Sequence, residues 1–166
     1  MHHKHDHTSS SVAILTLSDT RSLTEDKSGT KIEQLLSPLH TIVDRKLIKD
    51  DPLHLRAVLT DWIQDERISI IITTGGTGIS ERDTTYSIVE QLIETPMHGF
   101  GELFRFKSYE EIGARAMLSN AIAGTVNQTA IFSLPGSVHA VTLAMTELIL
   151  PTINHVSREL IKRSLD

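Results

Sequence analysis

The segment from Ile70 to Asp83 constrains the fold of this chain more than any other. It begins with three consecutive isoleucines, Ile70 to Ile72, and such a β-branched apolar run is typical of a strand covered on both faces of a sheet. The residues Thr-Thr-Gly-Gly-Thr-Gly follow at 73–78. Glycine allows a backbone to turn sharply and to approach a ligand closely, because it has no Cβ. We therefore predict a buried strand that ends in a glycine-rich, ligand-binding loop.

Two common phosphate-binding motifs do not account for this loop. A Walker loop requires a lysine after its four-residue gap, and no lysine lies between Ile70 and Asp83. A dinucleotide fingerprint requires a third glycine where Glu81 stands. Backbone N–H groups and threonine hydroxyls in the loop still favour an anion site, and Asp83 adds a carboxylate beside it. The alternative is an ordinary glycine-rich turn between a strand and a helix.

Strand and helix patterns alternate along most of the chain. Apolar runs predict strands, and apolar residues spaced i, i+3, i+4, i+7 predict amphipathic helices. The predicted strands are 12–17, 41–48 at an edge, 68–72, and the hairpin formed by 118–126 and 129–134. The predicted helices are 29–39, 52–64, 84–94, 108–117, and a final helical segment after 137 that Pro151 bends or restarts. This order predicts an α/β fold, a three-layer α/β/α sandwich with a mostly parallel central sheet.

Local signals predict where two of the helices begin. Asp51 stands directly before Pro52, and an aspartate at the N-cap with proline in the first turn is a common helix start. Capping requires only one of two consecutive acids. Asp50 is therefore either free for another role or present because the helix dipole favours acids there. Ser108 with Glu111 fits a capping box at the start of another helix.

Two segments are expected to be irregular. Residues 22–28 are polar, and we expect them to form a mobile loop. Gly99 and Gly101 are expected to interrupt regular structure between 96 and 105. The histidine-rich segment 1–11 contains nothing apolar to anchor it, so it is predicted to be a disordered native or tag-like tail, with metal binding as the alternative. The folded domain is expected at 12–166.

The composition excludes several classes of protein. A chain of 166 residues has the size of one domain. Its formal net charge of -5 argues against nucleic-acid binding, which needs a basic face. It has no cysteine, so disulfides and thiolate metal sites are excluded. No apolar run has the length of a membrane span and no signal-peptide core is present, so we expect a cytoplasmic protein without a membrane partner.

Three polar loops follow predicted strands, at 18–21, 74–83 and 135–137. The carboxyl ends of parallel strands meet at one edge of a sheet, so these loops are expected to converge. The last of them leads into a helix, and helix N-termini favour anions. With the acids Asp50 and Asp83, the three loops predict a site for an anionic ligand that can also bind a metal ion.

The chain resembles the MogA/MoaB family of molybdenum cofactor biosynthesis proteins, and its MoaB branch in particular, from residue 12 to about 158. The matching pieces are Ile-Leu-Thr-Leu-Ser-Asp at 14–19, Asp26 to Gly29, Thr-Gly-Gly-Thr-Gly at 74–78, Asp83, Gly-Phe-Gly-Glu at 99–102, Phe104-Arg105, Glu-Glu-Ile-Gly at 110–113, Ser119, Ala-Gly at 123–124 and Leu-Pro-Gly-Ser at 134–137. One departure is Asn120, which stands where many members carry arginine and removes a cation near the predicted site.

This resemblance implies molybdopterin adenylyltransferase activity, in which ATP and molybdopterin give adenylylated molybdopterin and pyrophosphate with the help of Mg²⁺. It implies that Asp50 and Asp83 are the catalytic residues and the metal ligands. The residues implied to bind substrate are Ser18, Asp19, Thr74, Gly75, Gly76, Thr77, Gly78, Glu102, Ser119, Pro135, Gly136 and Ser137. Backbone N–H groups at 75–78 and 136–137 are expected to bind phosphate or pterin groups.

Family members also assemble as trimers or hexamers, so the resemblance implies a symmetric homo-oligomer and other molybdenum cofactor biosynthesis proteins as partners. Exposed apolar residues at 100–106 and after 137 favour self-association as well. Some members of the MoaB branch are catalytically silent. The alternative function is therefore a non-catalytic molybdopterin-binding or scaffold protein of the same fold.

Overall fold

The centre of the molecule is a row of parallel strands whose residues are apolar enough to be covered on both sides. The structure is a computed structural model and describes residues 9–162. The strands are β1 Ser11–Leu17, β2 Thr41–Ile48, β3 Ile70–Thr74, β4 Thr95–Pro96, β5 Ile122–Val126 and β6 Thr129–Leu134. The α-helices are α1 Lys27–Leu36, α2 Pro52–Gln64, α3 Thr85–Leu92, α4 His98–Ile112, α5 Val138–Ala144 and α6 Leu150–Lys162. The 3₁₀ turns η1 Leu23–Glu25 and η2 Gly113–Leu118 and the π turn η3 Met145–Ile149 complete the elements.

The six strands form one sheet in the order β2-β1-β3-β6-β5-β4. β2, β1, β3 and β6 are parallel, whereas β5 pairs antiparallel with both β6 and β4. The register places Thr16 opposite Thr74 and Thr74 opposite Leu134. The carboxyl ends of β1, β3 and β6 therefore meet in one row, and the three polar loops begin side by side, as predicted.

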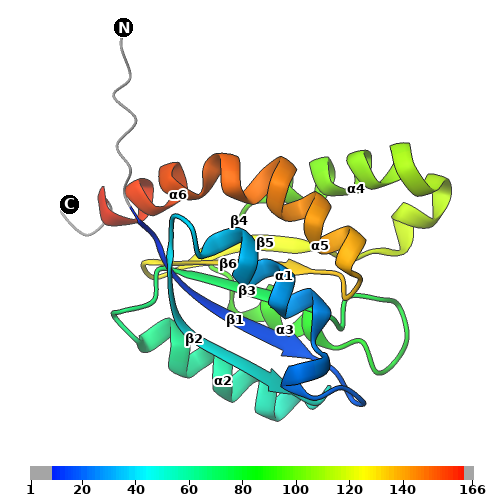
Figure 1. Cartoon of the computed structure of the whole chain (residues 1–166), viewed down its shortest axis with the longest axis horizontal. Coiled ribbons are helices and arrows are strands. Elements are labelled where there is room, and N and C mark those ends of the chain that lie inside the picture. The colour runs from blue at the N-terminus through cyan, green and yellow to red at the C-terminus, as the bar shows by residue number, and fades with distance from the viewer. Residues whose placement is uncertain (1–8, 163–166) are drawn as a thin grey trace, which may run out of the picture.

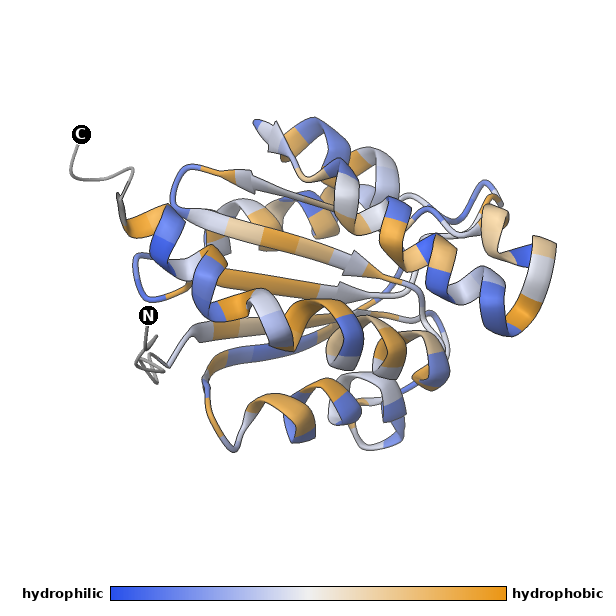
Figure 2. Cartoon of the chain, turned by 90° about the horizontal axis from the view of Figure 1, so that it is seen from above, coloured by the Kyte–Doolittle hydropathy of each residue, from blue (hydrophilic) through white to orange (hydrophobic). Residues whose placement is uncertain are grey.

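Helices cover both faces of the sheet (Figure 1). α1, α4, α5 and α6 lie on one face, and α2 and α3 lie on the other. Alternate residues of β1 enter the two cores: Val12 and Ile14 face the first, while Ala13 and Leu15 face the second together with Trp62 of α2. The central strands carry long apolar stretches (Figure 2). The predicted three-layer α/β/α sandwich is confirmed.

The predicted start of α2 is also confirmed. Asp51 is its N-cap, and Asp51 Oδ1 accepts hydrogen bonds from the N–H groups of Leu53 at 3.0 Å and His54 at 3.5 Å, with Pro52 in the first turn. Capping thus occupies Asp51 and leaves the side chain of Asp50 available. β2, predicted to lie near an edge, is an edge strand of the sheet.

The predicted interruption at Gly99 and Gly101 is wrong, because both glycines lie within the continuous helix α4. Phe100 and Phe104 of this helix are buried in the first core, and this packing outweighs the low helix propensity of glycine. Gly101 has a specific role, since a Cβ there would come within 2.9 Å of the carbonyl oxygen of Ala121. The capping box at Ser108 is wrong as well, because Ser108 lies inside α4.

The prediction of a mobile loop over 22–28 is wrong for its second half. Asp26 and Ser28 are buried, and Asp26 is the N-cap of α1, which begins two residues before the predicted Gly29. The helix also ends earlier than predicted, so that Leu39 lies beyond it and is 65% exposed.

α5, η3 and α6 follow one another as a single helical run. The π turn η3 ends directly before α6, in which Pro151 is the second residue. Proline has no N–H to continue the hydrogen-bond ladder, and a π turn is one way in which a helix accommodates such an interruption. Pro151 was predicted to bend or restart the final helix, and the change from η3 to α6 lies directly beside it, at Leu150.

Near the N-terminus, Ser10 is buried: its N–H donates to His40 Nδ1 at 3.0 Å and its hydroxyl bonds to that of Ser157 at 2.8 Å. Ser11 is the first residue of β1. These two serines of the predicted tail therefore belong to the fold, whereas 1–8 lie outside the described residues. Within 9–162, no helix combines the length and the apolar character needed to cross a membrane.

Candidate functional site at the carboxyl edge of the sheet

Two of the three loops at the carboxyl edge are in direct contact. Thr74 Oγ1 donates to the carbonyl oxygen of Pro135 at 2.8 Å, and the Gly75 N–H donates to the carbonyl oxygen of Leu134 at 2.9 Å. A Cβ on Gly136 would lie 3.5 Å from the Cα of Gly75. The expectation that the Gly75 N–H binds ligand is therefore wrong, because this group extends the pairing of β3 and β6 instead.

Gly76 is required by its backbone and by its surroundings. Its φ of +72° lies in the left-handed region, which favours glycine. A Cβ there would be 2.1 Å from Thr85 Oγ1 and 3.2 Å from Asp50 Oδ1. The turn thus brings the main chain of the glycine loop against the Asp50 carboxylate and the start of α3.

The edge carries two neighbouring hollows that share Gly136. The first, of about 430 Å³, is named here the acidic hollow; it is lined by Thr16, Leu17, Ser18, Asp19, Thr20, Arg21, Asp26, Ser28, Asp50, Thr74, Gly136 and Ser137. The second, of about 440 Å³, is named the glycine-loop hollow; it is lined by Gly75, Gly76, Thr77, Gly78, Asp83, Ile112, Arg115, Leu118, Ser119, Pro135 and Gly136.

Buried polar atoms without a partner gather at this edge. Within residues 9–162, six such side-chain atoms occur. Four of them belong to residues at or beside the two hollows: Asp50 Oδ1, Thr84 Oγ1, Thr85 Oγ1 and Ser119 Oγ. A buried polar atom left unpaired is unfavourable by about 1–3 kcal/mol. Their concentration here is the pattern expected where a polar ligand completes the hydrogen bonds.

The acids at the edge are electrostatically linked. The Asp50 N–H donates to Asp19 Oδ1 at 3.1 Å, and Asp19 Oδ2 pairs with the guanidinium of Arg82. Burial raises the pKa of Asp50, and the negative charges of Asp19 and Asp83 raise it further, while Arg82 opposes the shift. Asp83 Oδ2 accepts hydrogen bonds from the N–H and the hydroxyl of Ser80, at 3.1 and 2.8 Å.

The residues present fit a magnesium ion whose remaining coordination positions would be filled by water and substrate. Mg²⁺ is usually held by one or two carboxylates together with substrate phosphates. Asp50 Oδ1 has no hydrogen-bond partner among the described residues, and Asp83 is near enough to perturb it. Within 9–162, no group of three or more histidine or acidic side chains forms a complete metal cage. The donor set is therefore an open one, suited to a cation that arrives with its substrate.

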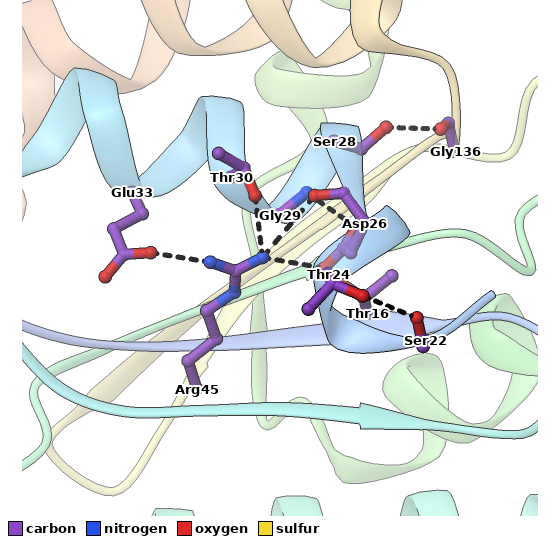
Figure 3. Close-up of polar contacts among 10 residues, drawn as sticks. All are labelled: Thr16, Ser22, Thr24, Asp26, Ser28, Gly29, Thr30, Glu33, Arg45 and Gly136. Carbon is purple, nitrogen blue, oxygen red and sulfur yellow. Dashed lines mark hydrogen bonds and ion pairs between the residues drawn. The ribbon is translucent and has the colours of Figure 1, made fainter.

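An ionic network surrounds the buried carboxylate of Asp26, which also lines the acidic hollow (Figure 3). Asp26 Oδ2 accepts from Thr16 Oγ1 at 2.6 Å and from Arg45 Nη2 at 3.2 Å, and Asp26 Oδ1 accepts from the Gly29 N–H at 2.9 Å. The same guanidinium donates to Glu33 Oε2 at 2.6 Å. The network therefore joins β1, β2 and the start of α1.

Ser28 extends this support to the site loop. Its Oγ donates to the carbonyl oxygen of Gly136 at 2.6 Å (Figure 3). Gly136 belongs to the loop between β6 and α5, where Ser137 is the N-cap and its Oγ accepts from the Ala140 N–H at 3.1 Å. Both ends of this loop are consequently fixed.

Nearly all of the predicted site residues lie at this edge. Those at the acidic hollow are Ser18, Asp19, Asp50, Thr74, Gly136 and Ser137, and those at the glycine-loop hollow are Gly75, Gly76, Thr77, Gly78, Asp83, Ser119 and Pro135. Glu102 is the exception, because it is exposed on α4 and lines neither hollow. Sequence reasoning assigned no role in the site to Asp26, Ser28 or Arg115. For the first two the signal was present, since they fall in a matching piece at 26–29.

Comparisons with known proteins agree with this geometry. Residues 13–155 match the family model described as a probable molybdopterin binding domain. Molybdenum cofactor biosynthesis protein B of Staphylococcus carnosus strain TM300 is 46% identical over 154 residues, which cover 90% of each chain. A crystal structure of a molybdenum cofactor biosynthesis protein B has a TM-score of 0.91 at 41% identity, covering 93% of this chain and 98% of that one. The tungsten cofactor synthesizing protein MoaB from Pyrococcus furiosus has a TM-score of 0.82 at 35% identity, covering 92% and 97%.

The fold and the family model together define the class of protein, an α/β domain of the molybdopterin-binding type. The chain belongs to the MogA/MoaB family of molybdenum cofactor biosynthesis proteins. The family indicated by the sequence is thereby confirmed.

Proposed function

We propose that this protein binds molybdopterin and ATP at the two hollows and adenylylates molybdopterin. A phosphate oxygen of molybdopterin attacks the α-phosphorus of ATP, and the bond from that phosphorus to the bridging oxygen of the β-phosphate breaks. The products are adenylylated molybdopterin and pyrophosphate. Transfers of this kind depend on positioning and on charge neutralisation more than on covalent chemistry by the protein.

The observation that carries the proposal is Asp50 Oδ1, a carboxylate oxygen buried at the edge without any partner among the described residues. An oxygen exposed to solvent would be hydrogen-bonded by water, but this one is buried. A carboxylate with a purely structural role would accept hydrogen bonds from neighbouring donors, as Asp26 does. Capping of α2 does not use Asp50, because Asp51 performs it. A role toward a bound cation or ligand accounts for its position.

Each part of the edge then has a task. Asp50 and Asp83 would hold Mg²⁺, which supplies charge neutralisation at the phosphates when it is bound. The N–H groups of Gly76, Thr77 and Gly78 donate to no other described residue, and they would bind an anionic group, as exposed amides in such turns do. Gly136 and Ser137 add the N-terminus of a second helix. Glu102 has no task in this scheme within one chain, because it lies away from both hollows.

Self-association and a cytoplasmic setting are part of the same proposal. α4 and the turn after it expose a patch of large apolar side chains, named here the α4 patch: Leu103, Phe106, Tyr109, Ile112, Met117 and Leu118. Large apolar side chains exposed on a small domain favour association. We expect a homotrimer or a hexamer, in which other molybdenum cofactor biosynthesis proteins can be partners. Phe106→Glu should shift the mass measured by light scattering toward the monomer, and an unchanged mass would contradict this assignment.

The experiment that tests the proposal is adenylyl transfer from radiolabelled ATP to molybdopterin with Mg²⁺. The wild type is compared with Asp50→Asn and Asp83→Asn, and Asp61→Asn on the exposed side of α2 is the matched control. We expect turnover by the wild type and the control, and a loss of about 100-fold or more in the two site variants, the scale of removing a principal electrostatic group. Molybdopterin binding without any adenylylated product from the wild type would refute the enzyme and leave a binding or scaffold protein.

A further inference from the structure

The glycine-loop hollow contains one acidic and one basic side chain. Asp83 lines it from the loop before α3, and Arg115 lines it from η2; its other lining residues are glycines, hydroxyl residues, a proline and apolar residues. Arg82 is the nearest other arginine in the loop sequence, but its guanidinium pairs with Asp19 of the acidic hollow. Arg115 is therefore the positive charge that this hollow has available.

The guanidinium of Arg115 has no partner among the described residues. It is exposed, and it makes no hydrogen bond or ion pair with another residue in the range that the structure describes. Arg45 and Arg105 are used very differently. The first lies in the buried network with Asp26, and the second donates to two main-chain carbonyls. A free arginine beside unsatisfied polar atoms is the arrangement expected of a group that receives an anion.

The chain holds η2 firmly in place over the hollow. Gly113, with a φ of +71°, ends α4 and turns the chain into η2. At its other end, the Asn120 N–H donates to the carbonyl oxygen of Thr77 at 3.0 Å, which joins η2 to the glycine loop. Arg105 Nη1 donates to the carbonyl oxygens of Ser119 at 3.3 Å and Ala121 at 3.0 Å. The position of Arg115 relative to the loop is thus set by contacts on both sides.

Ser119 gives a second, independent indication of a ligand here. Its Oγ is buried, lines the same hollow and has no hydrogen-bond partner among the described residues. The next residue, Asn120, is neutral, so this segment brings a positive charge to the hollow only through Arg115. A hydroxyl and a guanidinium together offer the donors that a phosphate group binds.

We propose that Arg115 binds a phosphate group of the substrate in the glycine-loop hollow, with Ser119 Oγ as a second donor. The inference rests on the proposed function, since it assumes that this hollow receives molybdopterin or ATP. Arg115 acts as a substrate-binding residue that supplies the cation this segment otherwise lacks. The planar guanidinium can bind two phosphate oxygens at once, which also fixes the orientation of the phosphate.

The test is isothermal titration of the full chain with molybdopterin and, separately, with Mg-ATP. The proteins are the wild type, Arg115→Ala, Arg115→Lys and the control Arg67→Ala, which removes the same charge at a site paired with Asp65 on the surface. For one of the two ligands, Arg115→Ala should raise the Kd by about 10- to 100-fold, the scale of a charge-assisted hydrogen bond. Arg115→Lys should lose less affinity than Arg115→Ala, because it keeps the positive charge. The salt dependence of the Kd should be weaker in Arg115→Ala than in the wild type.

The possible outcomes distinguish failure of the role of Arg115 from failure of the proposed function. Equal Kd values for wild type and Arg115→Ala with both ligands would overturn the role of Arg115 while leaving the proposed function intact. A change in oligomeric state without a change in Kd would overturn it too, because Arg115 would then serve an interface. Failure of the wild type to bind either ligand would refute the proposed function itself.

Discussion

Ser28 Oγ donates a hydrogen bond of 2.6 Å to the carbonyl oxygen of Gly136. The two residues are 108 positions apart in the chain, yet this bond ties the buried start of α1 to the loop that both hollows share. Ser28 is 2% exposed, whereas Gly136 is exposed. A buried side chain therefore holds a short, exposed loop in position at the place where ligand is expected.

Replacing Ser28 should consequently affect binding more than folding. Ser28→Ala removes the donor, which is expected to destabilise the protein by about 1 kcal/mol and to raise the Kd for ligand by about three- to tenfold. Calorimetric titration with molybdopterin and Mg-ATP measures the second effect, and thermal unfolding the first. Ser22→Ala is the control, because its hydroxyl contacts only neighbours in the exposed segment before α1. Identical Kd values in Ser28→Ala and wild type would contradict the positioning role.

Asp26 should be far more important for stability. Its carboxylate is 1% exposed and accepts from Thr16, Gly29 and Arg45. Asp26→Ala uncaps α1 and leaves the guanidinium without its buried partner, which should lower the free energy of unfolding by about 3–5 kcal/mol. Urea denaturation measures the change.

Glu110→Ala is the comparison for Asp26. Glu110 pairs with Lys107 at 3.9 Å on the surface, and an exposed pair of this kind contributes less than about 1 kcal/mol. Similar losses in Asp26→Ala and Glu110→Ala would show that the buried network is not a main source of stability.

The sequence was sufficient to predict which loops form the site, but not the buried contacts that hold those loops in position. The buried run at Ile70 and the acid before Pro52 are local signals, and they predicted the parallel strand, the glycine loop and the cap of α2. The network of Asp26 with Arg45 is not local. It depends on two strands lying side by side, so the polarity of segment 22–28 did not reveal that one of its acids would be buried, although Asp26 falls in a piece that matches the family.

Errors in α4 have the same physical origin. Gly99 and Gly101 predict an interruption by intrinsic propensity, and the burial of Phe100 and Phe104 overrides it. Arg115 was not predicted as a site residue, because a lone arginine in a short polar-apolar segment has no signature in one sequence. Its position at the glycine-loop hollow depends on the contact between η2 and the glycine loop, which is made in the folded structure.

Gly76 offers a test of the loop itself. Gly76→Ala would place a Cβ 2.1 Å from Thr85 Oγ1 at a φ of +72°, so both sterics and backbone strain oppose it. We expect a destabilisation of about 1–3 kcal/mol and a strong loss of ligand binding. Gly99→Ala is the matched control, since nothing lies within 4 Å of a Cβ there and the residue is in a helix. It should be neutral or stabilising by up to about 1 kcal/mol. Equal melting temperatures for the two variants would contradict this account of the loop.

The pH dependence of activity should report on Asp50. The pKa of Asp50 is raised by burial, then by Asp19 and Asp83, and Arg82 opposes the shift. Only the ionised carboxylate attracts a cation, so activity should fall as the pH drops through this raised pKa. Arg82→Ala removes the opposing charge and should move the acid limb of the pH–rate profile to higher pH. A limb that stays in place or moves to lower pH would contradict the assignment.

The same shift has the opposite sign for stability. Because its pKa is raised by folding, Asp50 binds a proton more tightly in the folded than in the unfolded protein. Its contribution to stability is therefore most favourable at acidic pH and decreases as the pH rises through the folded-state pKa. Asp50→Asn removes the ionised form, so it should raise the melting temperature of the ligand-free protein at pH 7, and this gain should shrink on acidification. Loss of activity together with a gain in stability at neutral pH would mark Asp50 as a residue kept for its ligand, and a variant less stable than wild type at pH 7 would instead assign it a structural role.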